Sequence, residues 1–126
     1  MTRPTLMRFL VVLVALPPVL ATPPALRVSA VPSQGDPARG KKIFIAKCVA
    51  CHKADGSGGF KLGGNPTPDW RDANRMADPR YSDGYLRDCI TNGKIKSGMV
   101  AWSKQGVKPA EIEHLIAHIR TLSKKK

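Results

Sequence analysis

Cys48-Val49-Ala50-Cys51-His52 is the most informative stretch of this sequence. It has the pattern C-x-x-C-H, in which two residues separate the cysteines and a histidine follows at once. On a helix this spacing puts the two sulfurs about one turn apart. The pattern is the attachment site of a c-type haem, in which each sulfur adds to a vinyl group and the histidine reaches the iron from the proximal side. The stretch therefore predicts one covalently bound haem c, attached through Cys48 and Cys51.

Two other kinds of site contain a C-x-x-C pair. A thioredoxin-type redox pair lies at the start of a helix that follows a strand, whereas here the pair ends a helical segment and runs into a glycine-rich stretch from Gly56. A structural zinc site needs a second pair of ligands, and only Cys89, His114 and His118 are on offer. The adjacent histidine, together with the export signal described below, favours haem.

The first 30 residues have the layout of a secretory signal peptide. Arg3 and Arg8 give a charged start, and residues 9–16 form an uninterrupted apolar run. Small residues suitable for cleavage follow at two positions, Ala21 and Ala30. We expect cleavage after Ala30 and export to the periplasm.

A retained membrane anchor is the alternative interpretation of this segment. A spanning helix needs about 20 apolar residues, and Pro17-Pro18 interrupts the run soon after it begins. Cleavage would leave a short lead-in at residues 31–35 and one domain at residues 36–126, with no other segment able to span a bilayer. Three arginines would leave with the leader and lower the formal charge from +12 to +9. A domain of this size often needs a cofactor to complete its core.

Three segments of the expected domain have helical patterning and recognisable ends. The first begins at Asp36-Pro37, a capping residue followed by proline, and continues to the haem motif. The second begins at Ser82-Asp83 and stops at Asn92-Gly93. The third begins at Pro109 and has an apolar stripe formed by Ile112, Leu115, Ile116, Ile119 and Leu122. Residues 54–79 are rich in glycine and proline without a period, which predicts a long loop organised by a buried haem. No strand alternation is persuasive, so the chain is predicted to be all-α.

These features together resemble a small class I cytochrome c. The resemblance covers about residues 36–122, nearly the whole expected domain. Its markers are Gly40 and Phe44, the haem motif, Ser82-Asp83-x-Tyr85-Leu86, Gly98-Met99-Val100-Ala101-Trp102 and Pro109-Ala110-Glu111-Ile112-x-x-Leu115. The resemblance implies a cytochrome c fold, with three to five helices packed around one covalently attached haem.

The resemblance also implies the axial ligands of the iron. In that family a methionine from a late loop binds opposite the histidine, which implies His52 and Met99 here. The usual loop reads Met-Pro-Ala-aromatic, and Val100 replaces its proline. This departure concerns the stiffness of the loop more than the ligation. Met76, in the segment before Pro79, is the other methionine of the expected domain.

Two further contacts are implied by the same resemblance. The terminal helices of such proteins cross where a glycine lets them approach, which implies Gly40 against the stripe around Leu115. A loop proline often supplies the carbonyl that accepts a hydrogen bond from the proximal histidine. Pro66 and Pro68 both suit this role, and the sequence does not choose between them.

Other residues have a functional and a plain structural interpretation. Cys89 could be a redox switch, but it shares a helix face with apolar residues, so we expect a buried and inert thiol. His114 and His118 stand four apart and could bind a metal, but we expect both to be exposed. Trp70 and Trp102 could donate a hydrogen bond to a haem propionate, but ordinary packing is the simpler expectation.

The expected function is the transfer of single electrons rather than catalysis, because an iron with both axial positions filled has no vacancy for a substrate. Thioether ligation also favours ferrous iron and raises the reduction potential. The positive charge favours redox partners with acidic docking surfaces, such as a membrane oxidase, a reductase or a periplasmic dehydrogenase. We expect a monomer and no binding of nucleic acid. The alternatives are a haem-based ligand sensor with a labile sixth ligand and an electron-entry subunit of a dehydrogenase complex.

Overall fold

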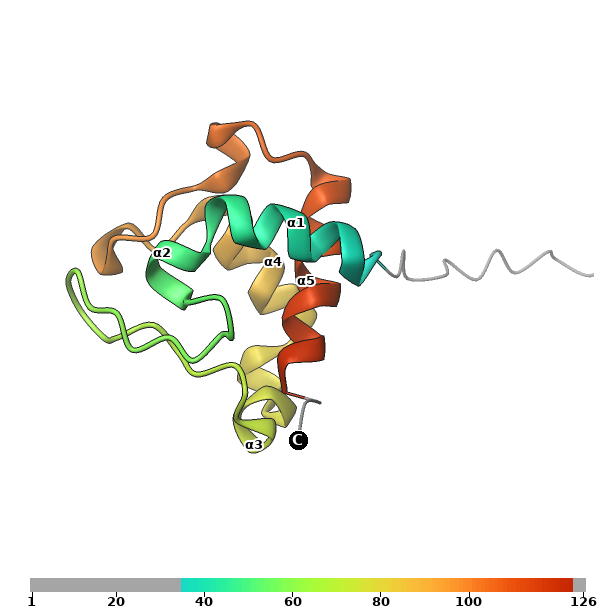
Figure 1. Cartoon of the computed structure of the whole chain (residues 1–126). Coiled ribbons are helices and arrows are strands. Elements are labelled where there is room, and N and C mark those ends of the chain that lie inside the picture. The colour runs from blue at the N-terminus through green and yellow to red at the C-terminus, as the bar shows by residue number, and fades with distance from the viewer. Residues whose placement is uncertain (1–34, 124–126) are drawn as a thin grey trace, which may run out of the picture.

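The computed structural model describes residues 35–123. The predicted signal peptide, nearly all of the lead-in and the three closing lysines therefore lie outside the described residues. These residues form five α-helices (Figure 1): α1 (Pro37–Lys47), α2 (Val49–His52), α3 (Ala73–Ala77), α4 (Asp83–Asn92) and α5 (Pro109–Leu122). The same part of the chain has three short 3-10 helices, η1 (Pro79–Tyr81), η2 (Ile95–Ser97) and η3 (Trp102–Gln105). Residues 35–123 contain no strand. The predicted all-α fold is confirmed.

The three long helices begin where their capping residues predicted. The Asp36 carboxylate accepts hydrogen bonds from the backbone N–H groups of Ala38 and Arg39, at 2.8 and 3.3 Å. The Ser82 hydroxyl accepts one from the N–H of Tyr85 at 3.3 Å. These bonds satisfy backbone donors that have no partner inside the helix. Helix α5 begins with proline at its first position, as expected.

Helix α1 crosses α5 (Figure 1). Gly40 of α1 lies against the backbone of α5 at His114. A Cβ atom on Gly40 would overlap the backbone carbonyl of His114. One turn later, Phe44 is completely buried against the other helices of the core. The predicted close approach of the terminal helices is confirmed, and any side chain at residue 40 would force them apart.

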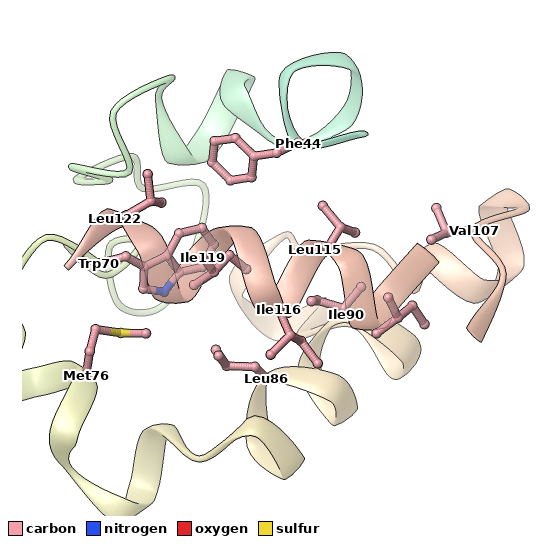
Figure 2. Close-up of a cluster of buried hydrophobic side chains, with 11 residues drawn as sticks. Phe44, Trp70, Met76, Leu86, Ile90, Val107, Leu115, Ile116, Ile119 and Leu122 are labelled. Carbon is pink, nitrogen blue, oxygen red and sulfur yellow. The ribbon is translucent and has the colours of Figure 1, made fainter. Parts of the chain in front are cut away.

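The apolar stripe of α5 forms the centre of the hydrophobic core. Figure 2 shows Phe44 on one side of α5 and Leu86 of α4 on the other. Leu115 and Ile119 are almost completely buried, with exposed fractions of 1% and 2%. Each such side chain contributes about 1.5–3 kcal/mol through removal from water. This burial fixes α4 on α5, and the same core borders a cavity through Leu86, Ile90 and Ile119.

One prediction about the histidines of α5 is wrong. His118 is 5% exposed, and its ring lies 5.1 Å from the ring of Phe44, measured between centroids. His114 is half-buried, and its Nδ1 accepts a hydrogen bond from the backbone N–H of Asp36 at 2.8 Å. Both rings are covered because α1 packs across this face of α5, which the apolar stripe alone did not indicate.

The predicted loop over residues 54–79 is also partly wrong, because it contains α3. The Asp72 carboxylate caps this short helix by accepting from the N–H groups of Asn74 and Arg75. Met76 is 7% exposed and belongs to the core (Figure 2). A single buried side chain gives no period, so the sequence pattern did not reveal this turn of helix.

None of the helices described in residues 35–123 has the length and hydropathy needed to cross a bilayer.

Candidate functional site

Helix α2 is a single helical turn that presents the haem motif. Its start is fixed by Cys48, whose carbonyl accepts hydrogen bonds from the N–H groups of Cys51 (3.3 Å) and His52 (3.0 Å). Both cysteines are half-buried and neither forms a disulfide. Burial raises the pKa of the Cys48 thiol to about 11, so the thiol stays protonated until it reacts. The two thiols and His52 all face one cavity.

This cavity has a volume of about 680 Å³ and mainly apolar walls. One wall is α2, and α4 contributes another through Leu86, Cys89 and Ile90. The loop after α2 and the segment after α4 complete the lining. A cavity of this size suits a large flat organic cofactor. Cys89 is 8% exposed, which confirms the expectation of a buried thiol, and it also lines the cavity.

The loop after α2 is organised by hydrogen bonds rather than by regular structure. The hydroxyl of Thr67 donates to the carbonyl of Cys51 at 2.9 Å, which ties the far side of the loop to the haem motif. Backbone bonds from Gly59 to Thr67 and from Thr67 to Phe60 close the loop upon itself. The N–H of Gly58 donates to the carbonyl of His52 at 3.1 Å. The loop therefore has a defined shape beside the cavity.

His52 is the only histidine of the described residues that lines the cavity. It is 7% exposed, and burial lowers its pKa to about 4. The ring is therefore neutral at physiological pH, which is the form that binds metals. Its Nδ1 is buried and has no hydrogen-bond partner within residues 35–123. The expected hydrogen bond from Nδ1 to the carbonyl of Pro66 or Pro68 is not formed in this structure, although both prolines line the cavity.

Of the two methionines that the structure describes, only Met99 lines the cavity. Its side chain is half-buried and packs against the edge of the hydrophobic core. Met76 instead lies inside the core. Met99 and His52 thus come from distant parts of the chain to the same cavity, whereas Met76 does not.

Arg75 and Tyr81 place a polar edge on this otherwise apolar cavity. A guanidinium nitrogen of Arg75 donates to the Tyr81 hydroxyl at 3.2 Å, and both residues line the cavity. The other five arginines among residues 35–123 form ion pairs with carboxylates, and Arg75 forms none there. The sequence patterns did not single out Arg75, because nothing in its spacing distinguishes it from the paired arginines.

The residues present fit a covalently attached haem. Two thiols one turn apart, a neutral imidazole and a thioether share one apolar cavity, which is the donor set that a covalently attached haem requires. Arg75 supplies a positive charge without a carboxylate, which suits the acidic groups of a porphyrin. The zinc alternative lacks support, because no group of three or more metal-binding side chains gathers within the described residues.

The two tryptophans both line the cavity, and they differ in burial. Trp70 is 6% exposed and packs in the core, while Trp102 is half-buried. The packing expected for Trp70 is therefore found. Its indole also lies flat on the ring of His52, a contact that sequence spacing could not reveal.

Comparison with known proteins agrees with this arrangement. Residues 35–119 match the family model described as cytochrome C oxidase, cbb3-type, subunit III. The chain is 25% identical to a solved structure, the KustC0563 c-type cytochrome, with a TM-score of 0.52 over 66% of this chain and 95% of that one. The structural similarity thus covers nearly all of the solved cytochrome.

Curated relatives match over shorter segments. A cytochrome c of Theileria annulata is 32% identical over 72 residues, which make up 48% of this chain and 63% of the relative. Cytochromes c of Ulva intestinalis and Chlamydomonas reinhardtii are 52% and 58% identical over 31 residues, which make up 25% of this chain and 28% of each relative. The chain therefore spans less than two thirds of the length of each of these relatives.

Proposed function

This chain belongs to the c-type cytochrome family described as cytochrome C oxidase, cbb3-type, subunit III, and on that premise we propose that it carries single electrons between redox proteins of the periplasm. The family implies one covalently attached haem c. The observation that carries the proposal is that Cys48, Cys51, His52 and Met99 all line one apolar cavity.

We assign Cys48 and Cys51 as the attachment points of the haem, and His52 and Met99 as the two axial ligands of its iron. When bound, the haem supplies a one-electron couple. His52 offers a neutral imidazole because burial disfavours its charged form. Met99 offers a soft thioether, which favours the reduced state of iron. The apolar walls exclude water and favour the less charged state as well.

With both His52 and Met99 bound, the iron would have no position open to a substrate, which supports carriage of electrons rather than catalysis. The backbone also supports ligation by Met99, because two hydrogen bonds with the backbone of Lys94 hold the segment that carries this residue. The haem-sensor alternative requires a loose Met99.

The mouth of the cavity supplies the docking surface in this proposal. Phe60, Leu62 and Val100 line the cavity and are 43%, 64% and 43% exposed. Lys47 and Lys94 line it as well. Each of these two lysines lies over an aromatic ring, Lys47 over Trp102 and Lys94 over Tyr85, and no lysine within residues 35–123 forms an ion pair with a carboxylate. An apolar centre with nearby positive charges suits an acidic surface on the partner protein. Such charges raise the rate of association more than they raise the affinity. The family description supports an oxidase as one such partner.

We also propose that residues 1–30 are removed on export, that residues 31–35 form a short lead-in and that residues 36–126 form the cytochrome domain as a monomer. Expression in a host with a haem-attachment system, followed by intact-protein mass spectrometry of the periplasmic fraction, tests this. Cleavage after Ala30 and the added mass of one haem are the expected results. A full-length protein in the membrane fraction would contradict it.

The reduced visible spectrum before and after addition of carbon monoxide tests the carrier function. An unchanged low-spin spectrum is expected, because both axial positions are filled. Rapid conversion to a carbon monoxide adduct would overturn the assignment and favour a ligand sensor. Co-purification with a dehydrogenase at the native expression level would instead favour the electron-entry subunit.

A further inference from the structure

The indole of Trp70 lies flat against the imidazole of His52. The two ring centroids are 4.2 Å apart and the ring planes differ by 9°. Both side chains are buried, with exposed fractions of 6% and 7%. The indole therefore covers one face of the imidazole and keeps water away from it.

Within residues 35–123, no hydrogen bond from Nδ1 fixes the plane of the His52 ring. Both Nδ1 of His52 and Nε1 of Trp70 are buried and have no hydrogen-bond partner within residues 35–123. A metal-binding histidine is usually oriented by a hydrogen bond from its second nitrogen. Here the contact between ring faces is the interaction that restricts rotation of the imidazole about its side-chain bonds.

The position of Trp70 is fixed independently of His52. Its backbone N–H donates to the carbonyl of Gly56 at 2.9 Å. Gly56 has φ of +77°, and a Cβ there would lie 2.6 Å from the Leu122 side chain of α5. The ring of Phe44 contacts the indole from another side, with centroids 5.9 Å apart and planes tilted by 54°. The end of α5 and the core helix α1 thus hold the indole in place.

We propose that Trp70 is a positioning residue for the proximal ligand: it sets the plane of the His52 imidazole and shields that ring from solvent. The proposal rests on the proposed role of His52 as an iron ligand. In this role the indole acts on the iron only through the histidine. The expected consequences are a fixed imidazole orientation and slow exchange of the Nδ1 proton with water.

The test compares holoproteins of wild type, Trp70→Leu and Trp70→Phe. Leucine fills space without a flat face, and phenylalanine restores a ring. Trp102→Leu is the matched control, because Trp102 also lines the cavity but makes no ring contact with His52 in this structure. All four proteins are compared at matched haem content, so that differences in haem loading do not affect the result.

Proton NMR gives two readouts that electron-transfer activity does not. The hyperfine-shifted haem methyl signals of the ferric protein report the imidazole plane, and the Nδ1 proton of His52 reports access of water. Trp70→Leu should change the pattern of haem methyl shifts. Its Nδ1 proton should exchange with water a few-fold to about tenfold faster, because loss of an aromatic contact changes an equilibrium constant by about that factor beyond the effect of buried area. Trp70→Phe should largely restore both readouts, and Trp102→Leu should leave the exchange rate of the His52 Nδ1 proton as in wild type.

A Trp70→Leu protein with the wild-type shift pattern and exchange rate would overturn the proposal. If Trp70→Leu does not fold, Trp70→Phe decides: a wild-type pattern supports the proposal, and a rearranged pattern refutes a role for the ring face. Failure of the proposed carrier function would be recognised separately, because the wild-type protein itself would then form a carbon monoxide adduct.

Discussion

Lys94 and Met99 form a pair of reciprocal backbone hydrogen bonds. The N–H of Lys94 donates to the Met99 carbonyl at 2.9 Å, and the N–H of Met99 donates to the Lys94 carbonyl at 3.2 Å. Between them η2 makes a tight turn that ends at Gly98, whose φ of +82° suits glycine. The backbone of Met99 is thus fixed without a proline at the next position. Val100, which replaces that proline, leaves this closure of the loop intact.

The first prediction concerns Met99→Ala. Loss of the thioether should open one axial position, so that the reduced protein binds carbon monoxide rapidly and its reduction potential falls. Visible spectroscopy with a redox titration measures both changes. The backbone pair with Lys94 does not depend on the side chain, so the variant should still fold and retain its haem.

Met76→Ala is the matched control for that experiment. Met76 is buried in the core, so its truncation should lower the free energy of unfolding by about 2–5 kcal/mol. Its spectrum should remain low-spin and insensitive to carbon monoxide. If Met76→Ala alone abolished the low-spin spectrum, the axial assignment of Met99 would be wrong.

The second prediction concerns the third cysteine. Cys89 lines the cavity from α4, but only Cys48 and Cys51 have the spacing of the attachment motif. Cys89→Ser should therefore keep its haem through acid–acetone extraction, with a loss of stability from a buried hydroxyl of about 1–3 kcal/mol. Cys51→Ser should lose one thioether bond, seen as a shift of the pyridine haemochrome band. Release of the haem from Cys89→Ser would disprove the assignment.

The parts of the fold that could be predicted from sequence are those with local signals. Asp36, Ser82 and Pro109 mark helix starts because capping chemistry involves only neighbouring residues. The haem motif is likewise local. Helix α3 was missed because it is five residues long and is held by distant contacts, the packing of Met76 in the core and a hydrogen bond from Arg120 to the Met76 carbonyl. Burial of His118 was missed because it depends on the crossing with α1.

The site shows the same division between local and distant information. The spacing of Cys48 and Cys51 predicts haem attachment and the resemblance implies Met99 as a ligand, and all three residues line one cavity. The stack of Trp70 on His52 joins residues on either side of an irregular loop. Its geometry depends on Gly56 and the end of α5, so no sequence period could predict it.

The third prediction concerns pH. Arg87 donates two hydrogen bonds to the Glu113 carboxylate, at 2.6 and 2.8 Å, and these join α4 to α5. They lower the pKa of Glu113 below its ordinary value of 4.5. Because folding lowers the pKa of Glu113, the stabilisation from its pair with Arg87 is present above pH 4.5. It is lost as the pH falls through the pKa of Glu113 in the folded state.

Glu113→Gln should therefore be less stable than wild type at pH 7, by about 0.5–1 kcal/mol for a pair at the surface. The difference should shrink below pH 4.5 and in 1 M salt, where screening is strong. Urea unfolding at several pH values measures it, and Arg87→Gln in a double-mutant cycle isolates the pair. A stability difference that is constant from pH 7 to pH 3 would show that packing, rather than charge, is the cause.

The last prediction concerns the helix crossing at Gly40. A Cβ at this position would overlap the His114 carbonyl, and a backbone atom in a helix cannot rotate away as a side chain can. Gly40→Ala should therefore push α1 from α5 and destabilise the holoprotein by about 1–3 kcal/mol, although alanine favours helix formation. Gly84→Ala is the matched control within α4, where the nearest atom to a new Cβ is the Ser82 hydroxyl at 3.8 Å. That variant should be unchanged or more stable by up to about 1 kcal/mol. Thermal unfolding followed by circular dichroism compares the two, and equal stability of both variants would mean that the crossing tolerates a side chain at residue 40.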